Sequence, residues 1–335
     1  MARSHLTLAA LATSAVPELD IVGATPFGAS RGSDFDAAIL TGRDGRHWII
    51  RVPNNERAEA EQSADLVALR TLSAGVRSRL PFAVSAFVGQ VPVDGTRAIV
   101  YEFVYGAKVP LSGFDEQLAS AVGRAIAAIH ALPTSFIADA GMPVLSASES
   151  QRACMSVMDR AAATGLVPAA LVGRWERAVE DPKLWQFQPT VVNGSLGADS
   201  FLTAIGADGA VQVTGVLGWH ELRVGDPARD LQWLLGSRDD AISNAGFDAY
   251  EHVHGVGDRQ LRHRAQFYAE LEVAKWLLHG TETRSTGIVD DAVEMLTAIV
   301  DDVHNDVMNP LTPTTAPVMA VDEVEALLAR GRYSA

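Results

Sequence analysis

A change of character along the chain constrains its fold more than any other feature. Short strand-like runs dominate residues 20–104, and two of them, 36–40 and 47–52, flank the hairpin turn sequence TGRDGR. The run RAIVYEFV (97–104) predicts a third clear strand, and the stretch 56–72 predicts one helix among the strands. This part of the sequence therefore predicts a small sheet crossed by a helix.

The remainder of the chain is predominantly helical. The stretch 112–133 predicts a strong helix, in which Ser112 and Asp115 have capping-box spacing and Pro133 ends the pattern. Further helices are predicted at 148–163, at 167–180 and from the GDPARDLQWLL segment to about 308, with short strands at 190–193, 200–204 and 211–217. A small sheet followed by a helical half predicts an α+β fold with two lobes.

The predicted boundaries divide the chain into three parts. We expect a β-rich N-terminal lobe at 1–104 and a helical C-terminal lobe at 105–308. A Pro/Thr-rich linker and a short terminal helix follow at 309–335.

Composition limits the classes of function. With 48% hydrophobic and 20% charged residues among 335, the chain has enough apolar material for a packed core. The net charge of −14 argues against a nucleic-acid partner and is compatible with a cationic small-molecule ligand. No run reaches the ~18 apolar residues of a membrane helix. The N-terminal apolar run is short for a signal peptide and the only cysteine is Cys154, so we expect a cytoplasmic protein.

Six segments, in a fixed order, carry a resemblance to a known family. They are GSDFD (32–36), WIIRVP (48–53), IVYEFVYG (99–106), VGRAIAAIHALP (122–133), VVNGSLGADSFL (191–202) and VTGVLGWHELRVGDPARDLQWLL (213–235). The chain resembles the aminoglycoside/macrolide phosphotransferases over about residues 5–305, and it looks closest to the macrolide branch. The resemblance implies a bilobal, protein-kinase-like fold and an ATP- or GTP-dependent phosphotransferase ancestry.

The family's catalytic positions are altered in this sequence. The family loop reads H-G-D, four residues, then N, and the matching positions are Asn193, Gly194, Ser195 and Ser200. The family's metal-binding Asp corresponds to Gly218. The resemblance thus implies that the general base and both magnesium ligands are replaced, because hydroxyls and glycine are poor substitutes for carboxylates around Mg²⁺. We expect no magnesium site, unless Asp199 acts as a substitute ligand.

The surrounding scaffold positions match the family pattern. Trp219, Asp226 and Asp230 are retained, and the resemblance implies that Asp226 braces the catalytic loop. We interpret His130 as a residue at a helix end and not as a metal ligand.

The resemblance also implies a nucleotide-binding cleft. Arg51 occupies the basic position on the third strand, and its acidic partner is expected to be Glu61 or Asp65. The remaining implied contacts are Gly28 and Gly32 over the phosphates and the backbone of Glu102 and Val104 at the purine.

Three functions remain open. The first is a catalytically impaired, pseudokinase-like relative that still binds a nucleotide or another small molecule. The second is an active phosphotransferase acting on a hydroxyl of a macrolide, an aminoglycoside or a related compound. The third is a binding scaffold that meets a protein partner through the predicted helix at 321–330.

Overall fold

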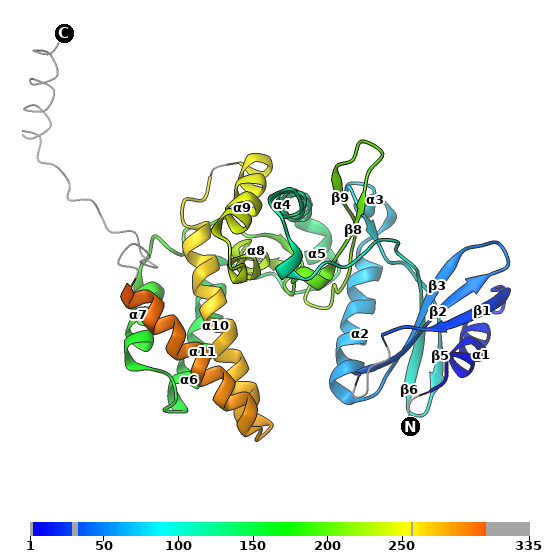
Figure 1. The fold of residues 1–335 in the computed structure, drawn as a ribbon, viewed down its shortest axis with the longest axis horizontal. Helices are drawn as coiled ribbons and strands as arrows, with labels where there is room; N and C mark the ends of the chain where they lie inside the picture. The colour runs from blue at the N-terminus through cyan, green and yellow to red at the C-terminus, as the bar shows by residue number, and fades with distance from the viewer. Residues whose placement is uncertain (1–2, 29–32, 256, 306–335) are drawn as a thin grey trace, which may run out of the picture.

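The computed structural model of the chain describes residues 3–28, 33–255 and 257–305. These residues form a smaller lobe built on a sheet and a larger helical lobe (Figure 1). The predicted two-lobed α+β fold is therefore confirmed. The predicted linker and terminal helix at 309–335, and Gly32, lie outside the described residues.

A five-stranded antiparallel sheet forms the N-terminal lobe, with strand order β1-β2-β3-β6-β5. The strands are β1 (Ile21–Pro26), β2 (Phe35–Gly42), β3 (His47–Pro53), β5 (Phe87–Val93) and β6 (Thr96–Glu102). The predicted turn between 40 and 47 joins β2 to β3, which pair along their whole length. Hairpins join β1 to β2, β2 to β3 and β5 to β6, while a crossover after β3 leads to the edge strand β5, so that β6 pairs with β3.

Two helices cover opposite faces of this sheet. Side chains alternate along a strand, so Trp48 and Ile50 on β3 pack in one core with α1 (His5–Ala15), while Arg51 faces the other side. The second helix, α2 (Glu56–Thr71), lies on that other side, toward the larger lobe (Figure 1). The sequence predicted α2 as the helix that crosses the sheet. The structure shows that α1 also packs against the sheet.

The larger lobe is mainly helical, and its helices enclose one continuous apolar core. The remaining helices of the described chain are α3 (Ala74–Arg77), α4 (Glu116–His130), α5 (Ser135–Asp139), α6 (Ala147–Ala163), α7 (Ala169–Glu180), α8 (Ala228–Leu231), α9 (Asp240–His254), α10 (Leu261–Glu282) and α11 (Thr286–Asn305). No helix among the described residues is both long and apolar enough to span a membrane.

Four short strands in the larger lobe position the loops that face the smaller one. β7 (Thr190–Val192) pairs with β10 (Arg223–Gly225), and β8 (Phe201–Ile205) pairs with β9 (Val211–Val216). A two-residue strand, β4 (Ala83–Val84), joins the edge of β9 in parallel. The loops after β7 and β9 consequently open toward the sheet of the smaller lobe.

The start of α4 differs from the prediction. Asp115 is the N-cap residue itself, and its Oδ1 accepts a hydrogen bond of 2.8 Å from the N–H of Leu118. A short 3₁₀ turn at Leu111–Gly113 precedes it, so the predicted capping box beginning at Ser112 is wrong. The physical reason is that the Asp115 carboxylate, as N-cap, accepts from an otherwise unpaired N–H of the first turn and needs no reciprocal partner.

Candidate active-site cleft

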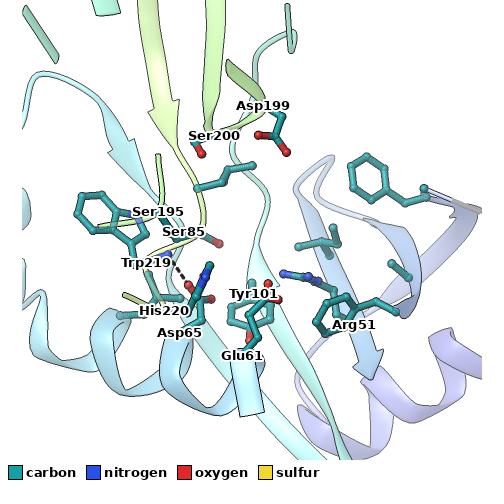
Figure 2. Close-up of a pocket in the computed structure, with 18 of the residues that line it drawn as sticks. Arg51, Glu61, Asp65, Ser85, Tyr101, Ser195, Asp199, Ser200, Trp219 and His220 are labelled. Atoms are coloured by element: carbon teal, nitrogen blue, oxygen red, sulfur yellow. Dashed lines mark hydrogen bonds between the residues drawn. The ribbon is translucent and has the colours of Figure 1, made fainter. Parts of the chain in front are cut away.

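A cavity of about 390 Å³ lies between the two lobes. Its walls come from β2, β3, α2 and β6 on one side and from the loops after β7 and β9 on the other (Figure 2). The lining residues are Phe27, Gly28, Ser33, Phe35, Ala37, Ile49, Arg51, Glu61, Asp65, Leu69, Ser85, Tyr101, Lys108, Ser195, Asp199, Ser200, Leu217, Gly218, Trp219 and His220. A concave, largely apolar cavity of this size, with a few polar groups, is typical of a small-molecule site.

The structure brings together the three positions that the resemblance assigns to the general base and the metal ligands. Ser195, Ser200 and Gly218 all line the cavity, although they come from separate segments. The hydroxyl of Ser195 donates to Oδ1 of Asn193 over 3.2 Å, and Nδ2 of Asn193 donates to the carbonyl of Gly218 over 2.9 Å. Asn193 is fully buried and ties the two loops together. It does not face the cavity.

The residues at these positions do not fit a magnesium ion. The hydroxyl of Ser200 accepts a hydrogen bond of 3.2 Å from the N–H of Gly197, so its oxygen is engaged with its own loop. Asp199 lines the cavity but is exposed. Within the described part of the chain, no three His, Cys, Asp or Glu side chains are grouped so that they could hold a metal. Mg²⁺ prefers several hard oxygen ligands in octahedral geometry, which this wall lacks.

The carboxylate that braces the catalytic loop is Asp230. Its Oδ2 accepts from the N–H of Asn193 and its Oδ1 from the N–H of Gly194, each over 2.7 Å. The expectation that Asp226 performs this role was wrong. Both oxygens of Asp226 face Arg264, at 2.8 and 3.1 Å, because the long Arg264 side chain enters the core from α10.

His130 completes this brace, a role that the sequence did not suggest. Its Nε2–H donates to Oδ2 of Asp230 over 3.1 Å, since a carboxylate can only accept, and Nδ1 lies 2.9 Å from the hydroxyl of Tyr250. The side chains of His130 and Asp230 are both fully buried. The helix end at 130 gave the position of the histidine, but nothing in the sequence indicated its partners.

Gly194 lies at the tightest point of the braced loop. Its φ is +88°, and a Cβ there would lie 2.6 Å from the carbonyl oxygen of Glu221. Only glycine fits this backbone conformation and this close approach. The loop therefore depends on glycine at position 194 for its shape.

The basic and acidic residues of the opposite wall do not form the expected ion pair. The guanidinium of Arg51 stacks over the ring of Phe35, 3.8 Å from the ring centroid. No carboxylate of the described residues lies within 4.0 Å of the Arg51 guanidinium, although Glu61 and Asp65 line the same cavity. Oδ1 of Asp65 instead accepts a hydrogen bond of 2.8 Å from the N–H of Trp219 (Figure 2).

The predicted purine contacts lie outside the cavity lining. The N–H of Glu102 donates to the carbonyl of Ala86, and the carbonyl of Glu102 accepts from the hydroxyl of Ser85, both over 2.8 Å. The side chain of Val104 packs against Gly215 so closely that a Cβ added to Gly215 would lie 2.4 Å from Cγ1 of Val104. Gly28 does line the cavity, with a φ of +65°.

The sequence analysis did not single out several lining residues, and among them Tyr101, Lys108 and His220 carry polar groups that a ligand can use. The hydroxyl of Tyr101 and Nδ1 of His220 are buried without a hydrogen-bond partner in the described structure. Burial also raises the pKa of Tyr101, so its hydroxyl stays protonated. Strand alternation from Ile99 could have indicated the direction of Tyr101, whereas Lys108 and His220 follow irregular segments without a periodic pattern.

Asp65 provides a test of the electrostatics of this wall. Burial raises the pKa of Asp65 above its ordinary value of 3.8, against the opposing effects of the Trp219 N–H and Arg51. The charged form therefore destabilises the fold increasingly as pH rises from 3.8 through the raised pKa. An Asp65→Asn variant keeps an oxygen for Trp219 and loses the charge, so it should be more stable than the parent at neutral pH.

The measurement is the free energy of unfolding of both proteins as a function of pH. The advantage of the variant should vanish once the pH falls below 3.8, where both side chains are neutral. Glu61→Gln, one turn earlier on α2, controls for the removal of one negative charge from this wall. A loss of stability in Asp65→Asn at neutral pH that disappears as the pH falls would show instead that the fold favours the ionised carboxylate.

Together, the sheet, α2, the interlobe cleft and the loop after β7 define a protein with a kinase-like fold. The family model described as "Phosphotransferase enzyme family" (APH) matches residues 28–268 of this chain. The chain belongs to this family.

Solved structures with similar folds include two kinds of antibiotic phosphotransferase. The macrolide 2'-phosphotransferase MphH of Brachybacterium faecium is 23% identical, with a TM-score of 0.69 over 86% of this chain and 97% of that one. The GDP complex of aminoglycoside 2'-phosphotransferase-IIIa is 18% identical, with a TM-score of 0.72 over 90% and 100% of the two chains. A Bacillus subtilis protein, the uncharacterized YcbJ, is 24% identical over 79% of this chain and 87% of its own length.

Proposed function

We propose that this chain is a catalytically impaired member of the phosphotransferase family that binds a nucleotide in its cleft without magnesium. One observation carries the proposal. The three positions that would hold the base and the metal ligands share one wall of the cavity, and they offer two hydroxyls and a glycine.

The chemical cost of these replacements is large. Phosphoryl transfer depends on positioning and on neutralising the charge of the transferred group, mostly by metal ions. A serine at position 195 has no basic oxygen to take a proton from a substrate hydroxyl, and loss of a general base alone costs roughly 10²–10⁴-fold in rate. Without metal ligands, several further kcal/mol of transition-state stabilisation are lost.

The rest of the cleft keeps features that suit a nucleotide. Arg51 and Lys108 can attract phosphates without a metal, and Phe27, Ile49 and Leu217 supply apolar surface for a base. The unpartnered Tyr101 hydroxyl and His220 Nδ1 are available to a ligand. Complexes of related kinases with GDP, ATP and ADP support ATP or GTP as the ligand to test first.

The test is a thermal-shift measurement with ATP and with GTP, each with and without magnesium. We expect stabilisation by at least one nucleotide, of similar size in both conditions. A ligand at a hundredfold excess over its Kd adds about 2.7 kcal/mol of stability, which is readily measured. Arg51→Gln should reduce the shift, while Arg124→Gln, an exposed arginine on α4, should leave it unchanged.

Two outcomes would contradict the proposal. A shift that requires magnesium would mean that other oxygens have rebuilt the metal site. No shift with either nucleotide would mean that the cleft serves a different ligand.

A working phosphotransferase is the second candidate, and the position of Asp199 favours it. This carboxylate lines the cavity beside Ser200 and is free to move, because it is exposed. If it replaced the lost ligand, the protein would transfer phosphate to a hydroxyl of an antibiotic-like compound, and Asp199→Ala would abolish that transfer. Incubation with labelled ATP or GTP and macrolides or aminoglycosides separates this candidate from the first.

A further inference from the structure

A second cavity, of about 240 Å³, lies entirely within the helical lobe. It is enclosed by α6, the β10 segment, α8 and α10. The lining residues are Leu145, Ser150, Ala153, Cys154, Val157, Arg223, Gly225, Asp226, Arg229, Tyr268, Leu271 and Lys275. No lining residue is shared with the cleft between the lobes.

Three of the four charged groups on this wall are cationic. Arg223 pairs with Glu221, and Lys275 pairs with Glu272, both over 2.5 Å. The two carboxylates do not line the cavity, and their side chains are 41% and 40% exposed, so solvent weakens both pairs.

The third cation, Arg229, has no such partner. Its Nε donates to the carbonyl of Gly194 over 3.1 Å, and no carboxylate of the described residues lies within 4.0 Å of its guanidinium. The one acidic lining residue, Asp226, is occupied by Arg264, whose partners also include Asp258. The wall therefore carries one cation, Arg229, without an ion-pair partner among the described residues, beside two cations whose carboxylate partners are exposed to solvent.

The behaviour of Lys275 agrees with this imbalance. Burial and, next, the nearby Arg229 lower the pKa of Lys275, and Glu272 only partly opposes them. Two cations that disfavour each other in a partly buried cavity are both stabilised by a bound anion.

The remainder of the wall is apolar or weakly polar. Leu145, Ala153, Val157 and Leu271 provide apolar contact surface. The side chains of Cys154 and Tyr268 hydrogen-bond each other, and burial raises the pKa of the Cys154 thiol to about 12, so neither adds a negative charge. A ligand for this cavity therefore combines an anionic head with a small apolar body.

We propose that this cavity binds a small organic oxyanion, a carboxylate or a phosphate monoester, through Arg229, Lys275 and Arg223. The net charge of −14 suggested a cationic ligand for the protein, whereas this cavity favours an anionic one, because its charged lining residues are mostly cationic. The inference does not depend on nucleotide binding in the cleft. Arg229 also contacts the catalytic loop at Gly194, so occupancy of the cavity is coupled to that loop.

The test is calorimetric titration with phenyl phosphate, benzoate and benzylamine in a chloride buffer of fixed ionic strength. We expect at least one of the two anions to bind and benzylamine not to bind. Arg229→Gln and Lys275→Gln should each weaken that binding about tenfold or more, since one hydrogen bond to a charged group is lost. Comparing the two anions distinguishes a phosphate ligand from a carboxylate.

Three matched variants keep the test sharp. Arg229→Lys preserves the charge and should retain most of the affinity, which separates loss of charge from loss of folding. Arg51→Gln and Arg124→Gln should leave anion binding unchanged. Binding of neither anion, binding of benzylamine, or loss of anion binding in Arg51→Gln but not in Arg229→Gln would each overturn the proposal, the last by placing the anion in the cleft.

Discussion

Replacing Asp230 with alanine should lower the free energy of unfolding by about 3–5 kcal/mol, the amount typical of breaking a buried charged network. The Asp230 carboxylate is fully buried and accepts hydrogen bonds from two backbone N–H groups and from His130. Its removal leaves those three donors buried without an acceptor, and each unsatisfied group costs about 1–3 kcal/mol. Small rearrangements of the loop recover part of the free energy lost by these three donors.

Urea denaturation of the variant and the parent measures this effect. Asp199→Ala is the matched control, because it removes an exposed carboxylate a few residues along the same loop and should change stability by no more than about 0.5 kcal/mol. The loss of stability in Asp230→Asn should fall between those of the other two variants. The amide oxygen still accepts a hydrogen bond, but the NH₂ group faces another donor. Equal, small effects of Asp230→Ala and Asp199→Ala would show that the loop does not depend on this brace.

The sequence predicted the parts of the fold that follow from local patterns. Strand-like runs and a hairpin turn sequence gave β2, β3 and β6, and the family resemblance assigned Arg51 to the cleft, which it lines. The family resemblance assigned Ser195, Ser200 and Gly218 to one site, and all three line the cavity.

Choices between equivalent partners could not be predicted. Asp226 and Asp230 are four residues apart and both buried, and only the approach of Arg264 from α10 decides which one is left for the loop. Glu61 and Asp65 are likewise one helical turn apart on α2. Only Asp65 lies where it accepts a hydrogen bond from the N–H of Trp219. Such selections depend on tertiary contacts between distant segments, which no spacing in the sequence encodes.

Restoring the family's residues at the altered positions should create magnesium-dependent nucleotide binding. The variant combines Ser195→Asp, Ser200→Asn and Gly218→Asp. A Cβ at Gly218 would meet no atom within 4 Å, so the new carboxylate has room, and aspartate is among the residues that best tolerate the left-handed φ of +71° found there. The new carboxylate and amide oxygens lie on one wall of the cavity, where they can bind Mg²⁺ together with the phosphates of a nucleotide.

We expect magnesium to raise nucleotide affinity of the restored variant about a hundredfold, which at saturation corresponds to about 2.7 kcal/mol of added stability. The matched control is Ser195→Ala, Ser200→Ala and Gly218→Ala, which also adds a side chain at position 218 but offers no ligand oxygen. Because each variant is compared with itself with and without magnesium, a magnesium effect that appears only in the restored variant reports on the metal site. A folded restored variant whose nucleotide affinity is indifferent to magnesium would mean that the loss of those three side chains is not what separates this chain from its active relatives.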